Sequence, residues 1–362
     1  MTKILCLIES LASGGAERQM VNLACLLQNN GFEVSILCYY QNEFFLPIIQ
    51  QKGVRYECVS HAKPIIRRLF DLNRVLYREK PDVLIAFMNT PSTLACLLKW
   101  IHPQINVIVS ERNYSVQNDV RQRLKFFMYR FADHIVSNSY TQAMNIKDRY
   151  KNLSDKLCVI TNWVDVKRFK RETVRTYWEN EKLGMTRFLV VGRRVEQKNV
   201  IRFLEAVAHV RQRGYNFVVK WVGPIVDALY YEQIRETMEK LELNNIVQFE
   251  DPMVDIVSVY SSADVFCLPS IYEGTSNAIC EAMCNGLPVL CGNICDNSRW
   301  VEDQVNGFLF NPYDVQSIAQ AMMNFMDLPP ERKQEISERN IAFSEDVFAP
   351  EQFVSKYIAL IE

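Results

Sequence analysis

The sequence predicts an α/β protein with two doubly wound domains, each built on a parallel sheet. Short β-branched runs alternate with amphipathic helical segments along the 362 residues, a pattern typical of parallel sheets with helices on both faces. The alternation breaks over the charged stretch 164–185, and a chain of this length is more typical of two domains than of one. We therefore expect two domains joined near residues 165–185.

The strands of the first domain are expected where short apolar runs occur, and helical periodicity fills the intervals between them. The expected strands are Lys3–Ile8, Glu33–Tyr39, Asp82–Met88, Asn106–Ser110, His134–Ser137 and Lys156–Ile160. The clearest helices are Ala16–Asn29 and Gln122–Phe131.

The second domain repeats this alternation and ends in helices. Its expected strands are Phe188–Gly192, Phe217–Gly223, Ile246–Glu250, Asp264–Pro269 and Pro288–Gly292. The last helices are expected at Val315–Met326 and Pro350–Ile361.

The composition excludes several classes of protein. With 49% hydrophobic and 23% charged residues and a net charge of −1, the chain is too apolar and too neutral for disorder. Its longest apolar runs, such as 83–88 and 264–269, are too short for a membrane span. Residues 4–8 are followed by Gly14 and Gly15, where a signal peptide would continue its apolar core.

The eleven cysteines fit reduced thiols better than a disulfide framework, because their number is odd and most lie in apolar segments. This predicts a cytoplasmic protein. Cys280, Cys284, Cys291 and Cys295 lack the paired spacing of a zinc site. No metal is therefore expected.

Positive charge is concentrated in the first half of the chain. Residues 1–165 carry 20 Lys+Arg and 14 Asp+Glu, and two stretches, Arg67–Lys80 and Arg121–Arg130, combine basic and aromatic residues. Such segments can lie on an anionic membrane surface, and solvated helix faces are the alternative. A sequence pI of about 6.5 argues against nucleic acid as a partner.

A glycine-containing loop follows the first strand of each domain. Gly14 and Gly15 precede a helix, whose free N–H groups can hold a phosphate, with an ordinary turn as the alternative. The loop does not match G-x-G-x-x-G, so a nicotinamide or flavin site is not supported. In the second domain, Arg193 and Lys198 follow Gly192. They could clamp a diphosphate leaving group, unless they are ordinary surface cations.

The most informative segment is Pro269–Ala282, where a strand passes through a loop into a helix that begins near Ser276. Glu273 lies in the loop, and Glu281 follows eight positions later in the helix. Backbone amides around Thr275–Asn277 are expected to face the same ligand. Carboxylates beside an anion-binding helix start suit a ligand that has both hydroxyls and phosphates, such as a nucleotide sugar.

The pair of Glu273 and Glu281 resembles the E-x7-E signature of the GT4-type retaining glycosyltransferases, which have the two-domain GT-B fold. The Gly-Gly-Ala-Glu-Arg loop at residues 14–18 and the string at Gly192–Asn199 are similar to two other landmarks of that family. Asn162–Asp165 stands where members often carry Asn-Gly-Val-Asp. The resemblance implies domains at residues 1–165 and 166–345 that face a central cleft, and a final helix, 346–362, that crosses back to the first domain.

The resemblance also implies a role for each matching residue. Glu273 would contact the transferred sugar, and Arg193 and Lys198 would contact the donor diphosphate, so these three are the expected catalytic residues. Glu281 would bind the ribose hydroxyls of the donor. The complete expected donor-binding set is Gly192, Gly274, Thr275, Ser276, Asn277 and Glu281.

The acceptor side departs from the family pattern. Gly14 and Gly15 would line it, but the histidine that many relatives place near the reacting sugar is missing. The corresponding strand ends in Ser110-Glu111-Arg112-Asn113. Glu111 or Arg112 is the candidate replacement, with a salt-bridged loop as the alternative.

The implied activity is transfer of a hexose or N-acetylhexosamine from a nucleotide-diphosphate sugar, with UDP as the expected nucleotide. The implied acceptor is a glycan or a lipid-diphosphate-linked glycan in polysaccharide or lipopolysaccharide biosynthesis, at the cytoplasmic face of a membrane. Because no D-x-D string occurs, we expect no metal and no cofactor beyond the nucleotide-sugar co-substrate. Two alternatives are a nucleotide-sugar epimerase of the same fold and a non-catalytic nucleotide-sugar-binding partner.

Overall fold

The computed structural model describes residues 1–59, 64–112, 119–171, 184–253 and 255–362. The chain forms two compact units. Unit 1 consists of Met1–Trp163 together with Pro350–Glu362, and unit 2 consists of Val164–Ala349.

Unit 1 is built on a seven-stranded parallel sheet with the order β3-β2-β1-β4-β5-β6-β7. Because β1 lies between β2 and β4, the strand order reverses at β1. Its strands are β1 (Lys3–Leu7), β2 (Glu33–Cys38), β3 (Arg55–Cys58), β4 (Val83–Phe87), β5 (Asn106–Glu111), β6 (His134–Ser137) and β7 (Leu157–Val159).

Helices cover both faces of this sheet, and each face has its own apolar core. One face carries α1 (Gly15–Asn29), α2 (Leu46–Gln51) and α16 (Pro350–Ile361). The other carries α3 (Ile65–Glu79), α4 (Asn89–Ile101), α5 (Val120–Met128), η1 (Tyr129–Phe131), α6 (Tyr140–Arg149) and η2 (Lys151–Lys156).

Unit 2 is built on a six-stranded parallel sheet with the order β10-β9-β8-β11-β12-β13. The strand order reverses at β8, which has β9 on one side and β11 on the other. The strands are β8 (Thr186–Val191), β9 (Phe217–Val222), β10 (Val247–Glu250), β11 (Val265–Leu268), β12 (Val289–Gly292) and β13 (Gly307–Phe310).

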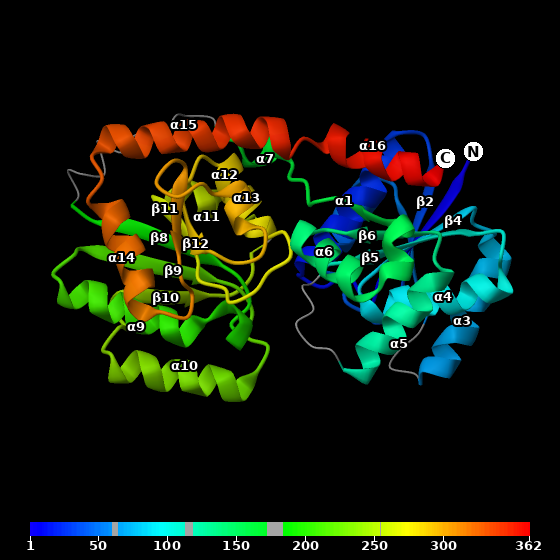
Figure 1. Cartoon of the computed structure of the whole chain (residues 1–362), viewed down its shortest axis with the longest axis horizontal. Coiled ribbons are helices and arrows are strands. Elements are labelled where there is room, and N and C mark those ends of the chain that lie inside the picture. The colour runs from blue at the N-terminus through cyan, green and yellow to red at the C-terminus, as the bar shows by residue number, and fades with distance from the viewer. Residues whose placement is uncertain (60–63, 113–118, 172–183, 254) are drawn as a thin grey trace. The chain divides into compact units, whose positions relative to one another are not determined.

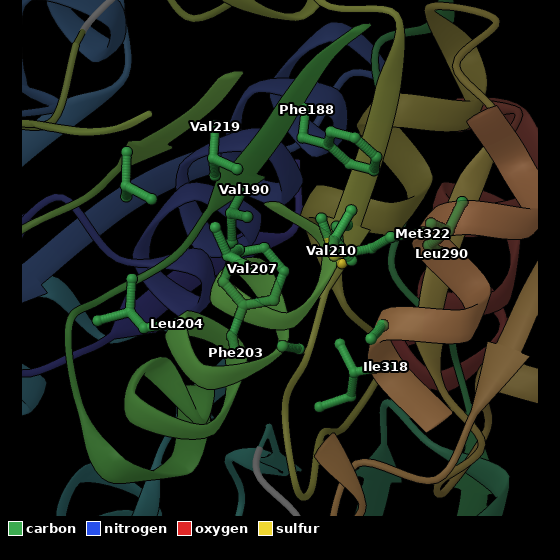
Figure 2. Packing of buried hydrophobic residues seen from close by; sticks show 14 of the residues in the cluster. Phe188, Val190, Phe203, Leu204, Val207, Val210, Val219, Leu290, Ile318 and Met322 are labelled. Carbon is green, nitrogen blue, oxygen red and sulfur yellow. The ribbon is translucent and has the colours of Figure 1, made fainter. Parts of the chain in front are cut away.

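Two apolar cores hold the helices of unit 2 on its sheet. Figure 2 shows the first core, where Phe203 and Val207 of α9 pack against Val190 of β8, and Met322 of α14 lies beside Leu290 of β12. The helices of unit 2 are α7 (Val166–Phe169), η3 (Glu196–Lys198), α9 (Val200–Gln212), α10 (Ala228–Lys240), α11 (Val257–Ser262), α12 (Asn277–Cys284), α13 (Asn297–Trp300), α14 (Val315–Met326) and α15 (Pro330–Val347).

The predicted fold class is confirmed, since both sheets are parallel and doubly wound. The sequence prediction did not include the strands β3 and β13 or the helix α15. β3 is a four-residue edge strand with two charged residues, so it lacks the apolar run that marks the central strands. The α15 helix is strongly charged and only one side of it is buried.

The chain passes between the units at positions that differ slightly from the expected ones. The expected boundary at residue 345 falls inside α15, and the crossover instead occurs before Pro350, the first residue of α16. Proline is tolerated at a helix start but not in a helix interior, which explains a new helix at this position. Most of the other expected junction, residues 172–183, lies outside the described residues, as does Asn113.

Candidate functional site

The candidate donor site of unit 2 lies where its strand order reverses. β8 and β11 are hydrogen-bonded neighbours, with Phe188 opposite Val265. Their carboxyl ends therefore emerge side by side, although the two strands are separated in sequence by β9 and β10. In open parallel sheets, ligands bind at such a reversal, beyond the carboxyl ends of the strands.

Backbone and side-chain hydrogen bonds join the loops that follow β8 and β11. The Ile271 amide donates to the Gln197 carbonyl at 3.0 Å, and the Gln197 side-chain amide donates to the Tyr272 carbonyl at 2.8 Å. Because both bonds lie beside η3, the second sequence motif is held against the third. The structure thus brings together two motifs that the sequence could only place separately.

The centre of this junction is an ion pair between Lys198 and Glu273. The Lys198 ammonium group donates to a carboxylate oxygen of Glu273. The two side chains are only 12% and 10% exposed. A cation and a carboxylate expected to act on the donor diphosphate and sugar are therefore adjacent at the strand ends.

The two arginines that follow Gly192 differ in their surroundings. Arg193 is exposed, and its guanidinium lies 3.4 Å from the Gln197 side-chain oxygen. Arg194 is buried, donates to the Glu250 carbonyl at 2.8 Å, and lies over the ring of Phe249. Arg193 can reach a ligand, whereas Arg194 holds the loop after β8 to the end of β10, on the far side of β9.

Glycines at the ends of β8 and β9 allow their backbones to approach closely. A Cβ atom on Gly223 would lie 2.1 Å from the Gly192 carbonyl oxygen, and one on Gly192 would lie 3.1 Å from the Lys198 side chain. The Trp221 indole also donates to the Gly192 carbonyl at 2.7 Å. Gly223 was not among the predicted site residues, because its importance depends on a neighbouring strand.

Asn199 also belongs to this junction and was missed as a site residue. Its backbone is left-handed, with φ of 59°, and it caps the start of α9. Its side-chain amide donates to the carbonyls of Pro269 (3.0 Å) and Pro312 (2.6 Å). Asparagine tolerates this backbone conformation better than most residues, which is the signal that could have identified it.

Glu281 lies in the second turn of α12 and is 3% exposed. One of its carboxylate oxygens accepts a hydrogen bond from the Tyr260 hydroxyl at 2.8 Å. Tyr260 comes from α11 and is fully buried. A tyrosine from another helix therefore orients this carboxylate, a contact that could not be predicted from the sequence.

The residues between the two glutamates form the start of α12. Ser276 is the N-cap, Asn277 begins the helix, and Thr275 and Ser276 are buried. Gly274, at the end of the preceding loop, is buried as well. The first amide groups of any helix lack intrahelical acceptors and favour anions. This arrangement has the properties of a phosphate- or sugar-binding loop.

The residues predicted on the acceptor side all belong to unit 1. Gly14 has an extended backbone and caps α1, and a Cβ atom there would lie 2.0 Å from a Glu17 carboxylate oxygen. Gly14 therefore makes room for Glu17 at the helix start, where Gly15 is the first helical residue. An unusual backbone conformation is not the reason for glycine at this position.

Glu111 and Arg112 are both buried at the end of β5, but they do not pair with each other. Glu111 accepts from the Lys125 ammonium group at 2.7 Å and from the Tyr129 hydroxyl. Burial and the nearby Glu111 raise the pKa of Tyr129 well above its usual range, so its hydroxyl stays a donor. Glu111 thus holds α5 and η1 to the sheet.

Arg112 has fewer partners. Its Nη2 donates to the Asn162 side-chain oxygen at 2.5 Å, and its guanidinium lies over the Phe87 ring. Its Nε and Nη1 atoms are buried without a hydrogen-bond acceptor among the described residues, and burial lowers its pKa. Of the two candidates, Arg112 retains hydrogen-bonding capacity for a ligand.

The cysteines are free thiols, and most of them are buried. Burial raises the pKa of Cys280 well above its usual range, and it raises the pKa of Cys284 to about 12. Within the described parts of the chain, no group of three or more His, Cys, Asp or Glu side chains is placed to hold a metal ion.

Comparison with known protein families accounts for both units. Residues 13–168 match the model described as Glycosyltransferase Family 4, and residues 178–342 match the model described as Glycosyl transferases group 1. The chain belongs to the GT4-type glycosyltransferases. The family predicted from the Glu273/Glu281 pair is therefore confirmed, and the chain is a glycosyltransferase.

Relatives of this glycosyltransferase act in bacterial polysaccharide assembly. It is 24% identical over 340 residues to the Escherichia coli UDP-Gal:alpha-D-GlcNAc-diphosphoundecaprenol alpha-1,3-galactosyltransferase, covering 86% of this chain and 85% of the relative. It is 25% identical over 337 residues to the Erwinia amylovora amylovoran biosynthesis glycosyltransferase AmsD, covering 88% and 91% of the two chains.

Solved structures confirm the GT-B fold. Anabaena HepE in complex with UDP and glucose has a TM-score of 0.86 at 18% identity, covering 99% of each chain. A Rickettsia africae glycosyltransferase has a TM-score of 0.83 at 19% identity, covering 99% of this chain and 97% of the other. Among the described residues, no helix is long and apolar enough to cross a membrane.

Proposed function

We propose that this glycosyltransferase transfers a hexose or N-acetylhexosamine from a UDP-linked sugar to a lipid-diphosphate-linked glycan, with retention of anomeric configuration and without a metal. The observation that carries the proposal is the Lys198–Glu273 pair, held by the joined loops at the reversal of the unit 2 sheet. The name of the Escherichia coli relative supports the donor and acceptor classes, since it contains UDP-Gal and a diphosphoundecaprenol-linked sugar.

In this proposal the cationic side chains of unit 2 stabilise the leaving diphosphate. Arg193 is exposed and Lys198 lies beside the start of the Glu273 loop. Cations that already lie where negative charge develops lower the activation barrier of a transfer reaction, because the site does not have to reorganise during the reaction. As the bond to the sugar breaks, the two side chains share the charge of the departing diphosphate, and a phosphate oxygen helps to take the acceptor proton.

Glu281 and Glu273 hold the two ends of the donor. The Glu281 carboxylate has one oxygen oriented by Tyr260, and its role is to accept hydrogen bonds from the ribose hydroxyls. Glu273, released in part from Lys198 when the diphosphate arrives, contacts the sugar. The amides at the start of α12 then bind the phosphates or sugar hydroxyls.

The acceptor is proposed to bind unit 1, with Arg112 and the Gly14–Gly15 helix start as its contacts. Because a lipid-linked acceptor remains in a bilayer, the enzyme must work at a membrane surface. We place that work at the cytoplasmic face, in line with the free cysteines of the described chain.

Binding and transfer are tested separately. Thermal-shift measurements with UDP, GDP, ADP and their sugars, with and without EDTA, identify the nucleotide, because a ligand of the native state raises the melting temperature. Transfer to a GlcNAc-diphospholipid is then followed by mass spectrometry, and the anomeric configuration of the product by NMR. A UDP-selective shift that EDTA does not change, together with an α-linked product, is the expected result.

The two alternatives give different results in the same assays. An epimerase would convert the donor sugar without any acceptor. A non-catalytic binding partner would show the UDP-dependent shift but no transfer to any acceptor in the panel. Either result, from protein shown to be folded, would overturn the proposed reaction.

A further inference from the structure

The outer surface of three helices in unit 1 has an unusual composition. α3, α4 and α5 cover the same face of the sheet, with α4 in contact with both of the others. Figure 1 shows these three helices together on one side of their sheet. The inner sides of these helices fill the core on that face of the sheet, and their outer sides are therefore expected to be polar. Many large apolar side chains nevertheless point outward.

The exposed side of α3 carries an apolar stripe. Ile66, Phe70 and Tyr77 are 69%, 69% and 59% exposed. Their separations of four and seven residues place all three on one helical face. On the opposite face, Leu72 and Leu76 are buried against the sheet, so α3 is apolar on both sides.

α5 repeats this arrangement. Val120, Leu124 and Phe127 are 79%, 59% and 53% exposed. Separations of four and three residues again place them on one face, while Phe126 and Met128 are buried on the other. Two helices of the same layer therefore each present an outward apolar stripe.

The end of α4 contributes aromatic contacts between these stripes. Trp100 is 65% exposed and packs edge-on against Phe131 at 4.9 Å, and Phe131 in turn contacts Phe127. On the α3 side, the Tyr77 ring lies 4.6 Å from that of His102, the residue that caps α4. Aromatic contacts thus connect the exposed residues of α3 and α5 to the carboxyl end of α4.

Arginine is the main charged residue around the stripes. Both α3 and α5 carry more basic than acidic residues, and the Arg130 guanidinium lies 5.0 Å from the Phe127 ring centre. The exposed arginines of the layer are Arg67, Arg74, Arg78, Arg121, Arg123 and Arg130. Among them, Arg78 already pairs with Glu57 and Glu79. Arg68, by contrast, is buried over the Tyr39 ring and is structural.

We propose that this outer face of α3, α4 and α5 binds the surface of an anionic lipid bilayer. Apolar and aromatic side chains enter the boundary between headgroups and acyl chains, and the arginines around them pair with anionic headgroups. A surface that contacts only water rarely carries so many large apolar side chains, since large contiguous apolar patches are rare on monomeric soluble proteins. The inference rests on the proposed lipid-linked acceptor and names the surface that brings the enzyme to it.

The test is co-sedimentation of the full chain with vesicles. Phosphatidylcholine vesicles with added phosphatidylglycerol are compared with vesicles of phosphatidylcholine alone. The double variant F70S/F127S removes one ring from each stripe, and R74Q/R123Q removes one charge from each helix. Leu229→Ser is the control, because Leu229 is more exposed (79%) than either phenylalanine but lies on α10 of unit 2.

We expect the wild-type chain and the Leu229→Ser variant to bind anionic vesicles alike. F70S/F127S should bind vesicles at least about tenfold more weakly than the wild-type chain does. R74Q/R123Q should bind about tenfold more weakly than wild type to anionic vesicles, with no difference on vesicles of phosphatidylcholine alone. Equal binding by F70S/F127S and wild type would overturn the proposal. So would light scattering that shows a dimer which F70S/F127S dissociates, since the face would then join two copies.

Failure of this inference is distinguishable from failure of the proposed function. UDP binding by thermal shift and transfer to an acceptor dispersed in detergent need no bilayer. F70S/F127S should keep both within about twofold while losing its activity on acceptor embedded in anionic vesicles. If activity in detergent is lost together with vesicle binding while the fold is intact, the apolar face serves the reaction itself and the proposal is wrong.

Discussion

The Lys198 ammonium group contacts the Glu273 carboxylate, although 75 positions separate the two residues in the chain. The contact exists because β8 and β11 are neighbours in the sheet, so that the loops after them meet. Taking two charges out of water costs free energy that their attraction only partly offsets. A largely buried ion pair at the strand ends is therefore better explained by a ligand that uses both charges than by a contribution to stability.

Replacing Lys198 with Met should affect both turnover and stability. The substitution leaves the Glu273 carboxylate buried without its cation, which is expected to cost about 3–5 kcal/mol, and it removes a cation from the leaving diphosphate, which should lower kcat about 10²–10³-fold. Urea unfolding and steady-state kinetics measure the two effects. The control is Lys220→Met, because Lys220 forms a more exposed pair with Glu250 and should cost under about 1 kcal/mol. A normal kcat in a folded Lys198→Met enzyme would contradict its assigned role.

Glu281 and Tyr260 should act on donor binding as a coupled pair. Glu281→Gln removes the charged acceptor proposed for the ribose hydroxyls and should raise the donor KM about tenfold, the effect of one charge-assisted hydrogen bond. Tyr260→Phe keeps the Glu281 carboxylate but removes the hydrogen bond that orients it, so we expect a smaller increase in the donor KM. In the double variant the two effects should not add, because the tyrosine acts through the carboxylate. Simple additivity would show that Tyr260 serves only the core.

Gly223→Ala should weaken donor binding although Gly223 itself is not proposed to contact the donor. The new Cβ would lie 2.1 Å from the Gly192 carbonyl oxygen, so the loop carrying Arg193 and Lys198 must move. We expect a loss of stability of about 1–3 kcal/mol and a higher donor KM. Gly214→Ala is the comparison: its φ is +85° but nothing lies near its Cβ position, so it should cost about 1 kcal/mol and leave KM unchanged. Equal KM values for both variants would refute the proposed coupling.

Glu111 and Arg112 should separate into a structural residue and a ligand-binding residue. Lys125→Met leaves Glu111 buried with the Tyr129 hydroxyl as its remaining strong partner, and should destabilise the protein by about 3–5 kcal/mol without changing either KM. Arg112→Lys keeps the charge but loses the fork geometry, so it should raise the acceptor KM while donor binding is unchanged. A change in donor binding alone would place Arg112 elsewhere.

Stability should fall at alkaline pH because of buried thiols. Burial raises the pKa of the Cys6, Cys96 and Cys284 thiols to about 12, from a usual value of 9.0. Above pH 9 the unfolded chain releases these protons while the folded chain retains them, so the free energy of unfolding should decrease as the pH rises. Below pH 9 both states are protonated and the effect disappears. Urea titrations on both sides of pH 9 test this, and Cys96→Ala should show a shallower slope.

Much of the architecture could be predicted because the central strands carry continuous apolar runs. β1, β4 and β11 are buried almost throughout, and such runs stand out from the amphipathic helices between them. The edge strand β3 and the helix α15 lack this contrast, since each contains charged residues along its exposed side. Their places depend on the neighbours that cover them rather than on their own pattern.

The candidate site divides in the same way. Glu273, Glu281, Arg193 and Lys198 could be proposed as site residues from the sequence, because each belongs to a recognisable local motif that follows a strand end. Local motifs, however, do not show which loops meet. Gly223, Asn199 and Tyr260 contribute through contacts with residues 21 to 113 positions away. Local sequence can at most indicate that Asn199 tolerates a left-handed backbone, and it does not show which residues these three contact.

The residue order alone therefore predicts the α/β fold from its periodicity, and a glycosyltransferase with a candidate site at strand ends from the resemblance of its motifs, since both depend on neighbouring positions. Tertiary structure decides which charges are paired and which remain available. It pairs Glu273 with Lys198, Glu111 with Lys125, and Arg112 with Asn162, and it leaves the Nε and Nη1 atoms of Arg112 without an acceptor in the described chain. These pairings follow from strand order and burial, which bring together side chains that are distant in sequence and remove them from water.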